Sequence, residues 1–193
     1  MTPDDTLAAV VEESLRVKSR VIASCSSEFN RLADALTNAF RNGNKLLLCG
    51  NGGSASDAQH VAGELAGRFL LERRALPAIA LNADCAILTA LANDYSFEII
   101  FERQIEALAC PGDIVAGIST SGNSLNIVKA LEAARRMGAL TVGFTGEGGG
   151  KLAEFADICI CAPSKVTARI QEAHITIWHA LCQYVETSLF RVQ

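Results

Sequence analysis

Short apolar runs alternate with segments of helical periodicity along most of this chain. The run at 114–118 is apolar at nearly every position, which is typical of a parallel strand buried on both faces. Comparable runs occupy 46–49, 78–81, 140–145 and 158–162. Helical patterns begin at residue 54 and recur at 86–92, 97–108, 125–137, 152–156 and 167–190, with a turn at Asn93-Asp94. This alternation predicts an α/β fold, a doubly wound parallel sheet flanked by helices.

An N-terminal helical extension precedes the first strand. Its periodic apolar positions predict two helices, at 4–24 and 28–41, and Asn42-Gly43-Asn44 ends the second. Helices that come before any strand are not crossover helices, so we expect them to pack outside the sheet or against another subunit. The chain is thus interpreted as a single domain over 1–193, with packing helices in 1–43 and an α/β core in 44–193.

Composition narrows the class of protein further. With 50% hydrophobic and 20% charged residues, the 193-residue chain can fill a sizeable core. Its net charge of -4 gives no reason to expect nucleic acid as a partner. No apolar run reaches the roughly 20 residues of a membrane span, and the acidic start MTPDDTLAAVVEESL is unlike a signal peptide. We therefore expect a cytoplasmic protein without a membrane partner.

The seven cysteines are interpreted as buried small hydrophobic residues rather than as a functional group. Their number is odd, the chain has no C-x-x-C motif, and several lie in apolar runs. Unpaired cysteines also agree with a reducing compartment.

A glycine turn follows the first strand and opens a helix. Gly50-Asn51-Gly52-Gly53 provides residues that tolerate positive φ and close backbone approach, and Ser54 begins the helical pattern. The free N–H groups and partial positive charge of a helix N-terminus bind anions. This turn is therefore a candidate phosphate site.

Dinucleotide binding is an alternative for the same turn. Gly50-x-Gly52-x-x-Ala55 matches the dinucleotide fingerprint in form, but Asn82 stands where an acidic residue should end the next strand, and Asp84 comes later. The other phosphate loop, GxxxxGK[ST], is absent from the sequence. We expect no nucleotide cofactor.

A second turn carries hydroxyl groups where the first carries glycines. Ser119, Thr120, Ser121 and Ser124 lie within six residues, between a buried strand and a helix, with no cation among them. Helix capping would explain one or two of these hydroxyls. Four of them favour an anion site of neutral donors that surrounds a phosphate monoester.

Two helices carry candidate acid–base or metal-binding residues. His60 and Glu64 stand four residues apart and share a helix face. In the last helix, Gln171 and His179 are eight residues apart, about 80° around the axis. A histidine in an apolar helix is more often a packing residue, and the spacing does not show that the helices meet. Together, however, these groups are suited to bind zinc or to transfer protons.

The combined motifs resemble the phosphoheptose isomerase family of SIS-domain proteins, whose sheet is Rossmann-like. The stretches that carry the resemblance span nearly the whole chain: LLLCGNGGSASDAQHVAGEL, PAIAL, AND, GISTSGNS, TGEGGGKLA and ARIQEAHITIWH. The resemblance implies a cytoplasmic homotetramer that isomerises sedoheptulose 7-phosphate to D-glycero-D-manno-heptose 7-phosphate, an aldose–ketose isomerisation leading to the lipopolysaccharide core.

The resemblance also implies roles for particular residues. Proton transfer falls on Glu64 and His179. The ligands of a zinc ion, one per subunit, fall on His60, Glu64, Gln171 and His179. Phosphate contacts fall on Ser54, Ser119, Thr120, Ser121 and Ser124, and further substrate contacts fall on Asn51, Gly52, Gly53, Glu64, Asn93, Asp94 and Gln171. Ala168 departs from the pattern, because some family members have an aspartate there.

Two other functions remain open at this point. The fold also hosts a non-catalytic relative that binds a replication initiator protein; that relative shares the alanine at position 168 but lacks an acid at the position of Glu64, so Glu64 favours the enzyme. A regulator that senses sugar phosphates would need an attached DNA-binding domain, and no segment of the sequence supplies one.

Overall fold

The computed structural model describes residues 2–190, and over this range it is an α/β protein. Its strands are β1 (Leu46–Gly50), β2 (Ala78–Ala80), β3 (Ile114–Ile118), β4 (Leu140–Thr145) and β5 (Ile158–Cys161). Its helices are α1 (Pro3–Arg41), α2 (Gly53–Ala66), α3 (Cys85–Asp94), α4 (Glu102–Leu108), α5 (Leu125–Arg136), α6 (Leu152–Phe155) and α7 (Thr167–Phe190), with a 3₁₀ turn η1 (Phe97–Ile99).

The strands form one parallel sheet in the order β2-β1-β3-β4-β5, which confirms the predicted fold class. The chain passes from β1 to β2 on one side, and then crosses to β3 on the other side of β1. The direction in which strands are added therefore reverses between β1 and β3. In open α/β sheets, ligands bind at the carboxyl ends of the strands at such a reversal. The topology therefore places a binding crevice between the ends of β1 and β3.

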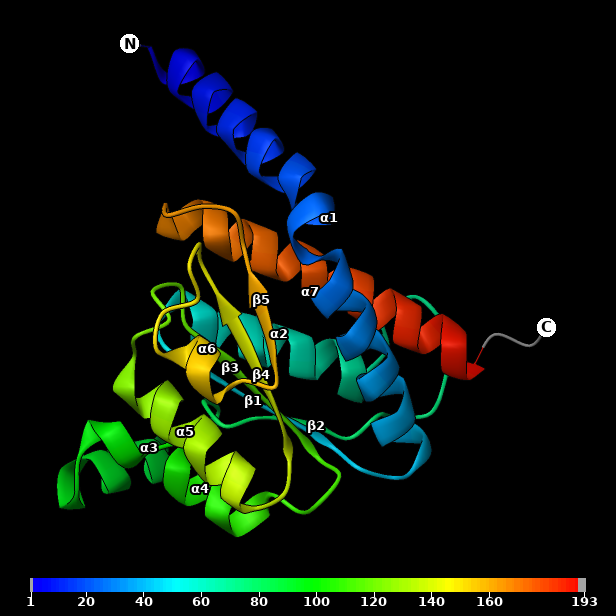
Figure 1. Ribbon diagram of the computed structural model, residues 1–193, viewed down its shortest axis with the longest axis vertical. Coiled ribbons are helices and arrows are strands. Elements are labelled where there is room, and N and C mark those ends of the chain that lie inside the picture. Colours follow the sequence, from blue (N-terminus) through cyan, green and yellow to red (C-terminus); the bar gives the residue numbers. More distant parts are fainter. Residues whose placement is uncertain (1, 191–193) are drawn as a thin grey trace.

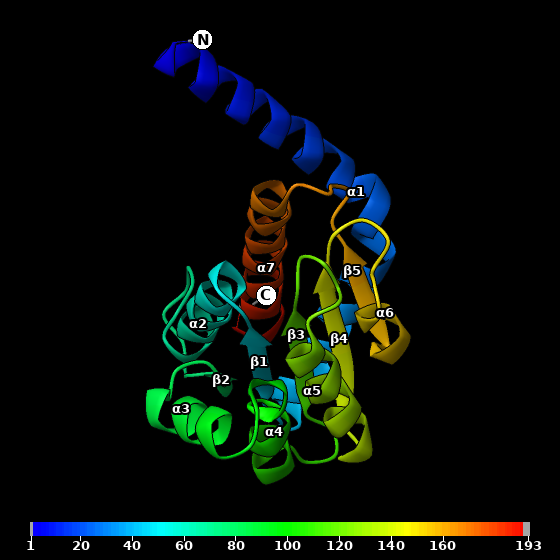
Figure 2. The same ribbon diagram turned by 90° about the vertical axis from the view of Figure 1, so that its left-hand side faces the viewer.

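Helices cover both faces of the sheet (Figures 1 and 2). Leu46 and Leu48 of β1 join the core beneath α1, α2 and α7. Leu47 and Cys49 point to the opposite face, into a core completed by residues of α4 and α5. Consecutive strand positions thus enter two different cores, which is why β1 and β3 are apolar and buried throughout.

The N-terminal extension is one helix of 39 residues, so the prediction of two helices is wrong. Ser26 and Ser27 lie where a break was expected, but the hydroxyl of Ser26 donates to the carbonyl of Ile22 at 2.5 Å and stays within the helix. The C-terminal half of α1 packs against α7 and β5, whereas its N-terminal half projects from the body (Figure 1). A projecting amphipathic helix is consistent with the packing role expected for residues 1–43.

Two further differences from the sequence-based expectation are larger than a shift of one residue at the end of an element. Asn93 and Asp94 form the last turn of α3 rather than a free turn. The helix expected over 97–108 is divided into η1 and α4. Ile100 and Phe101, which lie between these two elements, are buried in the core, so packing overrides the helical periodicity.

The cysteines follow the expectation of burial only in part. Cys25, Cys49 and Cys182 are buried, but Cys85 and Cys110 are exposed, so the interpretation as buried residues is wrong for those two. Burial raises the pKa of the Cys49 thiol to about 12, which keeps it protonated and chemically inert. Over residues 2–190, no helix combines the length and apolar character that crossing a bilayer requires.

Candidate functional site

The two predicted phosphate-binding turns lie side by side. Gly50 at the end of β1 pairs in register with Ile118 at the end of β3, so the glycine turn and the serine turn leave neighbouring strands at the same level. Across the crevice, Asn51 and Asn126 exchange two amide hydrogen bonds, each of 2.9 Å. This reciprocal pair, which sequence reasoning missed, fixes the first turn against the start of α5.

The glycines of the first turn serve different purposes. Gly52 precedes α2 with a φ of 55°, in the region that favours glycine. Gly53 allows close approach: a Cβ there would lie 2.5 Å from Nε2 of Gln171, and that side chain would have to move. The turn therefore brings the N-terminus of α2 against the first turns of α7.

The hydroxyls of the second turn are grouped and not used for helix capping. Oγ of Ser119 lies 3.0 Å from Oγ of Ser124 and 3.5 Å from Oγ of Ser121. Ser124 occupies the N-cap position of α5, yet within the described chain its side chain makes no capping hydrogen bond. The hydroxyl and the first N–H groups of α5 thus remain available to a ligand, which favours an anion site over simple capping.

A cavity of about 260 Å³ opens between these turns and α7. Three helices begin at it, since its lining includes Gly53 of α2, Ser124 before α5 and Thr167 of α7. None of its lining residues, all within the described part of the chain, is basic. The positive potential therefore comes from helix N-termini and the hydrogen-bond donors from hydroxyl, amide and peptide N–H groups.

The cavity collects most of the predicted substrate contacts. It is lined by Asn51, Gly53, Ser54, Ser119, Thr120, Ser124 and Gln171, together with Ile118 and Thr167. Thr167 is not among the predicted contacts, although its place at the start of a helix could have indicated it. Ala168 follows it in the first turn of α7 and is exposed.

Five predicted substrate contacts are not among the lining residues of this cavity. Glu64 lies further along α2. Gly52 and Ser121 belong to its two turns and are exposed. Asn93 and Asp94 are exposed on α3, where Nδ2 of Asn93 donates to Oδ1 of Asp94 at 2.9 Å. Their contact with substrate stays a prediction.

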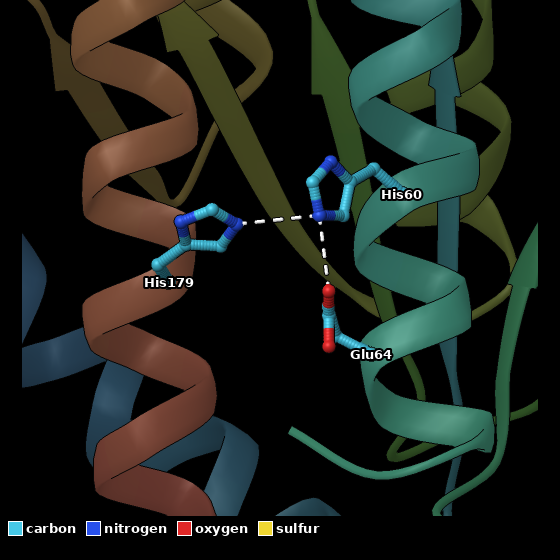
Figure 3. Close-up of side chains that lie close together, drawn as sticks. All are labelled: His60, Glu64 and His179. Carbon is cyan, nitrogen blue, oxygen red and sulfur yellow. Dashed lines mark hydrogen bonds and ion pairs between the residues drawn. The ribbon is translucent and has the colours of Figure 1, made fainter. Parts of the chain in front are cut away.

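His60 and Glu64 of α2 meet His179 of α7, although 119 residues separate the two histidines (Figure 3). Nε2 of His60 lies 3.0 Å from Oε1 of Glu64 and 3.3 Å from Nε2 of His179. His60 is exposed and the other two are half-buried. The three side chains point toward one another, so the helices bring together two imidazoles and a carboxylate that solvent reaches.

These three groups are suited to hold a divalent metal ion. One ligand atom from each residue lies within 4.8 Å of the others. Zinc accepts imidazole nitrogen and carboxylate oxygen at about 2.0 to 2.2 Å, so only small adjustments are needed to bring the ligands to such distances. Gln171 lies two turns before His179 on α7, at the cavity, where its side-chain amide is held against Gly53.

Two neighbouring side chains form the surroundings of this cluster. The ring of Phe69 packs on that of His179, with centroids 5.5 Å apart. Burial raises the pKa of the Asp57 carboxyl, while the charge of His60 acts in the opposite direction. Neither residue stands out in the sequence.

Two other polar residues of the last helix have structural roles. His174 is fully buried and its Nε2 donates to the carbonyl of Thr145 at 2.9 Å. Burial lowers the pKa of its imidazole to about 4, so it stays neutral. Arg169 connects α7 to α1, donating to the carbonyl of Val10 at 3.0 Å.

Comparison with protein families supports one assignment for this arrangement. The family model described as SIS domain matches residues 11–146. The chain is 54% identical over 180 residues to a phosphoheptose isomerase of Roseiflexus sp. (strain RS-1), which covers 93% of this chain and 91% of that protein. It is 53% identical over 177 residues to a phosphoheptose isomerase of Aquifex aeolicus (strain VF5), covering 92% of this chain and 93% of that one.

Solved structures give the same result. The phosphoheptose isomerase from Neisseria gonorrhoeae superposes with a TM-score of 0.91 at 39% identity, covering 96% of this chain and all (100%) of that one. The phosphoheptose isomerase from Francisella tularensis superposes with a TM-score of 0.93 at 38% identity, covering 97% and 100%. The likeness thus includes the long N-terminal helix as well as the sheet.

Proposed function

The chain belongs to the SIS-domain proteins and, among them, to the phosphoheptose isomerases, and from this we propose that it converts sedoheptulose 7-phosphate to D-glycero-D-manno-heptose 7-phosphate. It is an aldose–ketose isomerase. The product enters ADP-heptose synthesis for the lipopolysaccharide core, and the reaction takes place in the cytoplasm. The non-catalytic alternative, a partner of a replication initiator, gains no support from the comparisons.

One observation carries the proposal: the cavity and the cluster lie along the same helix. Ser54 lines the cavity, and His60 stands six residues further along α2. At 1.5 Å per residue this is a rise of roughly 9 Å. A sugar whose phosphate is bound in the cavity can therefore extend along α2 and place its carbonyl end at the cluster.

The isomerisation needs a base at carbon and a proton donor at oxygen. We infer that Glu64 removes a proton from C1 and returns it to C2, through an enediolate with negative charge on O2. His179 donates a proton to O2 and accepts the proton of the O1 hydroxyl, which becomes the new carbonyl. Atoms and charge balance over the cycle, and both groups return to their initial state.

We propose that the cluster binds one zinc ion per subunit through one atom each of His60, Glu64 and His179, with Gln171 as a further ligand. The second carboxylate oxygen of Glu64 and the second ring nitrogen of His179 then carry out the proton transfers. A bound zinc ion supplies Lewis-acid polarisation of a carbonyl oxygen. Support comes from the donor set and from the close approach of its atoms. None of the described residues that line the cavity is basic, so the cavity offers no positive side chain to polarise the carbonyl. We therefore expect this polarisation to come from a metal ion at the cluster.

Metal removal tests this part of the proposal. Dialysis against a chelator should lower kcat, and added zinc should restore it, with a stoichiometry of one ion per chain by metal analysis. His60→Gln should lose the ion, whereas His174→Gln should keep it because His174 lies in the core. Full activity of metal-free protein would contradict the zinc proposal and leave the isomerase proposal in place.

A substitution in the serine turn tests the proposed phosphate site. Ser124→Ala removes a hydroxyl that lines the cavity, and a hydrogen bond to a charged group contributes about 1.5 to 3 kcal/mol. KM should therefore rise roughly 10- to 100-fold with kcat little changed. Ser27→Ala, an exposed position on α1, is the control. An unchanged KM in Ser124→Ala would place the phosphate elsewhere.

We propose that the protein is a homotetramer assembled through α1. The projecting half of α1 exposes Leu7, Val11 and Leu15. An apolar groove of about 450 Å³ runs between α1 and α7, with Phe29 and Ile177 in its lining. Light scattering should give four times the chain mass for the native protein and a lower mass for Leu15→Asp. An unchanged mass in the variant would show that this face is not the interface.

The direct test of function is an isomerase assay. Purified protein is incubated with sedoheptulose 7-phosphate, and the aldose product is followed by proton NMR. In D₂O, the product should carry deuterium at C2 to the extent that the transferred proton exchanges with solvent. Absence of any aldose product with zinc-loaded protein would contradict the proposed activity.

A further inference from the structure

A buried ion pair lies beside the cluster and connects the two helices that build it. Arg73 follows α2 in the chain and Glu186 belongs to α7; Nε of Arg73 lies 3.1 Å from Oε1 of Glu186. Their side chains are only 1% and 2% exposed. Breaking such a pair leaves an uncompensated buried charge, so its presence at this point calls for an explanation.

Arg73 binds the C-terminal end of α2. Nη2 donates to the backbone carbonyl of Glu64 at 2.8 Å, and Nη1 donates to the carbonyls of Leu65 at 2.8 Å and Gly67 at 2.9 Å. The guanidinium thus donates to carbonyls at the helix end that lack a partner within the helix, and its charge complements the helix dipole. One of these carbonyls belongs to a residue of the cluster itself.

Glu186 binds the segment that follows α2. Its carboxylate accepts the backbone N–H groups of Phe69 at 3.0 Å, Leu70 at 2.7 Å and Leu71 at 2.8 Å. Burial raises the pKa of this carboxyl, but those N–H groups and Arg73 outweigh it, so the pKa lies below its usual value and the group is charged. Phe69, held in this way, packs on His179.

We propose that Arg73 and Glu186 are positioning residues that set the spacing of His60, Glu64 and His179. The helices α2 and α7 are held together at two levels. Gly53 and Gln171 are in close contact at one end, and the ion pair joins Glu64, Phe69 and α7 at the other. The cluster lies between these two levels, so its geometry depends on both. This inference rests on the proposed function, which gives that geometry its purpose.

The chain has only three histidines, which makes a direct test possible. Two belong to the cluster, and the third, His174, is buried in the core and reports on the fold. Arg73→Lys keeps the charge but loses the planar fork that reaches both Glu186 and the carbonyls of α2. In metal-free protein, the imidazole resonances of His60 and His179 should shift, while those of His174 stay unchanged.

Zinc affinity provides the second measurement. It should fall about 10- to 100-fold in Arg73→Lys, the usual effect of losing a partner that orients metal ligands. Asp113→Asn is the matched control, because it breaks another ion pair, Lys45 to Asp113 at 2.6 Å, at the amino ends of β1 and β3. It should lower the melting temperature without moving the resonances or the zinc affinity.

The outcomes separate this inference from the proposed function. Lower thermal stability of Arg73→Lys with native resonances and native zinc affinity would overturn the positioning role. If native protein binds no zinc, the metal proposal fails, and the resonances alone decide the positioning role. Should Arg73→Lys fail to fold, Glu186→Gln undergoes the same two measurements, since it removes the charge and one of the two acceptor oxygens.

Discussion

Replacing Glu64 by glutamine is expected to lower kcat by about 10²- to 10⁴-fold, the contribution of a positioned acid or base. Glutamine has nearly the same shape but cannot accept the carbon-bound proton. KM should change little, because the cavity that we propose for the phosphate lies roughly 9 Å along α2 from the cluster. Initial rates over a range of substrate concentration measure both constants.

Two controls make this result specific. Zinc content is measured in the same preparation, so that loss of the ion is distinguished from loss of the base. Glu72→Gln makes the same chemical change at a carboxyl whose side chain is 91% exposed and should leave kcat unchanged. Near-normal turnover of a zinc-loaded Glu64→Gln protein would assign the proton transfer to another group.

Replacing Gly122 by alanine is expected to have the second large effect, on stability and on phosphate binding together. Gly122 has a φ of 67°, and a Cβ there would overlap the carbonyl oxygen of Gly149. Backbone strain costs about 1 to 2 kcal/mol, and overpacking costs about 1 to 3 kcal/mol. The loss of unfolding free energy should thus be roughly 2 to 5 kcal/mol, with a raised KM because the serine turn must move.

A control substitution at Gly148, which precedes Gly149 in the chain, distinguishes backbone strain from steric overlap. Gly148 also has positive φ, 92°, but a Cβ there would meet open space. Gly148→Ala should therefore lose only the strain energy, about 1 to 2 kcal/mol, with KM unchanged. Urea denaturation gives the free energies. Equal losses of unfolding free energy in the two variants would mean that the contact between Gly122 and Gly149 does not hold the serine turn in place.

The sequence predicted those elements whose limits are set locally. β3 and β4 have the expected bounds because turn residues enclose continuous apolar runs, and α7 also has its expected bounds, 167–190. The break within α1 was wrong because a serine pair is only a weak helix breaker when a hydroxyl can bond back to the preceding turn. Strand order did not follow from any local pattern.

The candidate site, too, could be predicted from the sequence only in part. Both turns could be recognised from short motifs, but their adjacency follows from the pairing of β1 with β3. The meeting of Glu64 with His179 was expected only through the family resemblance, since residues on separate helices have no fixed distance along a sequence. Arg73 and Glu186 were missed altogether, because a buried ion pair formed across 113 residues has no local signature.

No lysine or arginine is among the described residues that line the cavity. The pH dependence of phosphate binding there should therefore follow the ionisation of the ligand. Neutral hydroxyls and peptide dipoles have no charge to gain or lose near neutral pH, whereas the dianion of a phosphate monoester takes up one proton with a pKa of about 6. Affinity at this pocket is thus set by the fraction of dianion in solution. Acidification weakens retention by changing the sugar phosphate, while the protein surface that receives it stays the same.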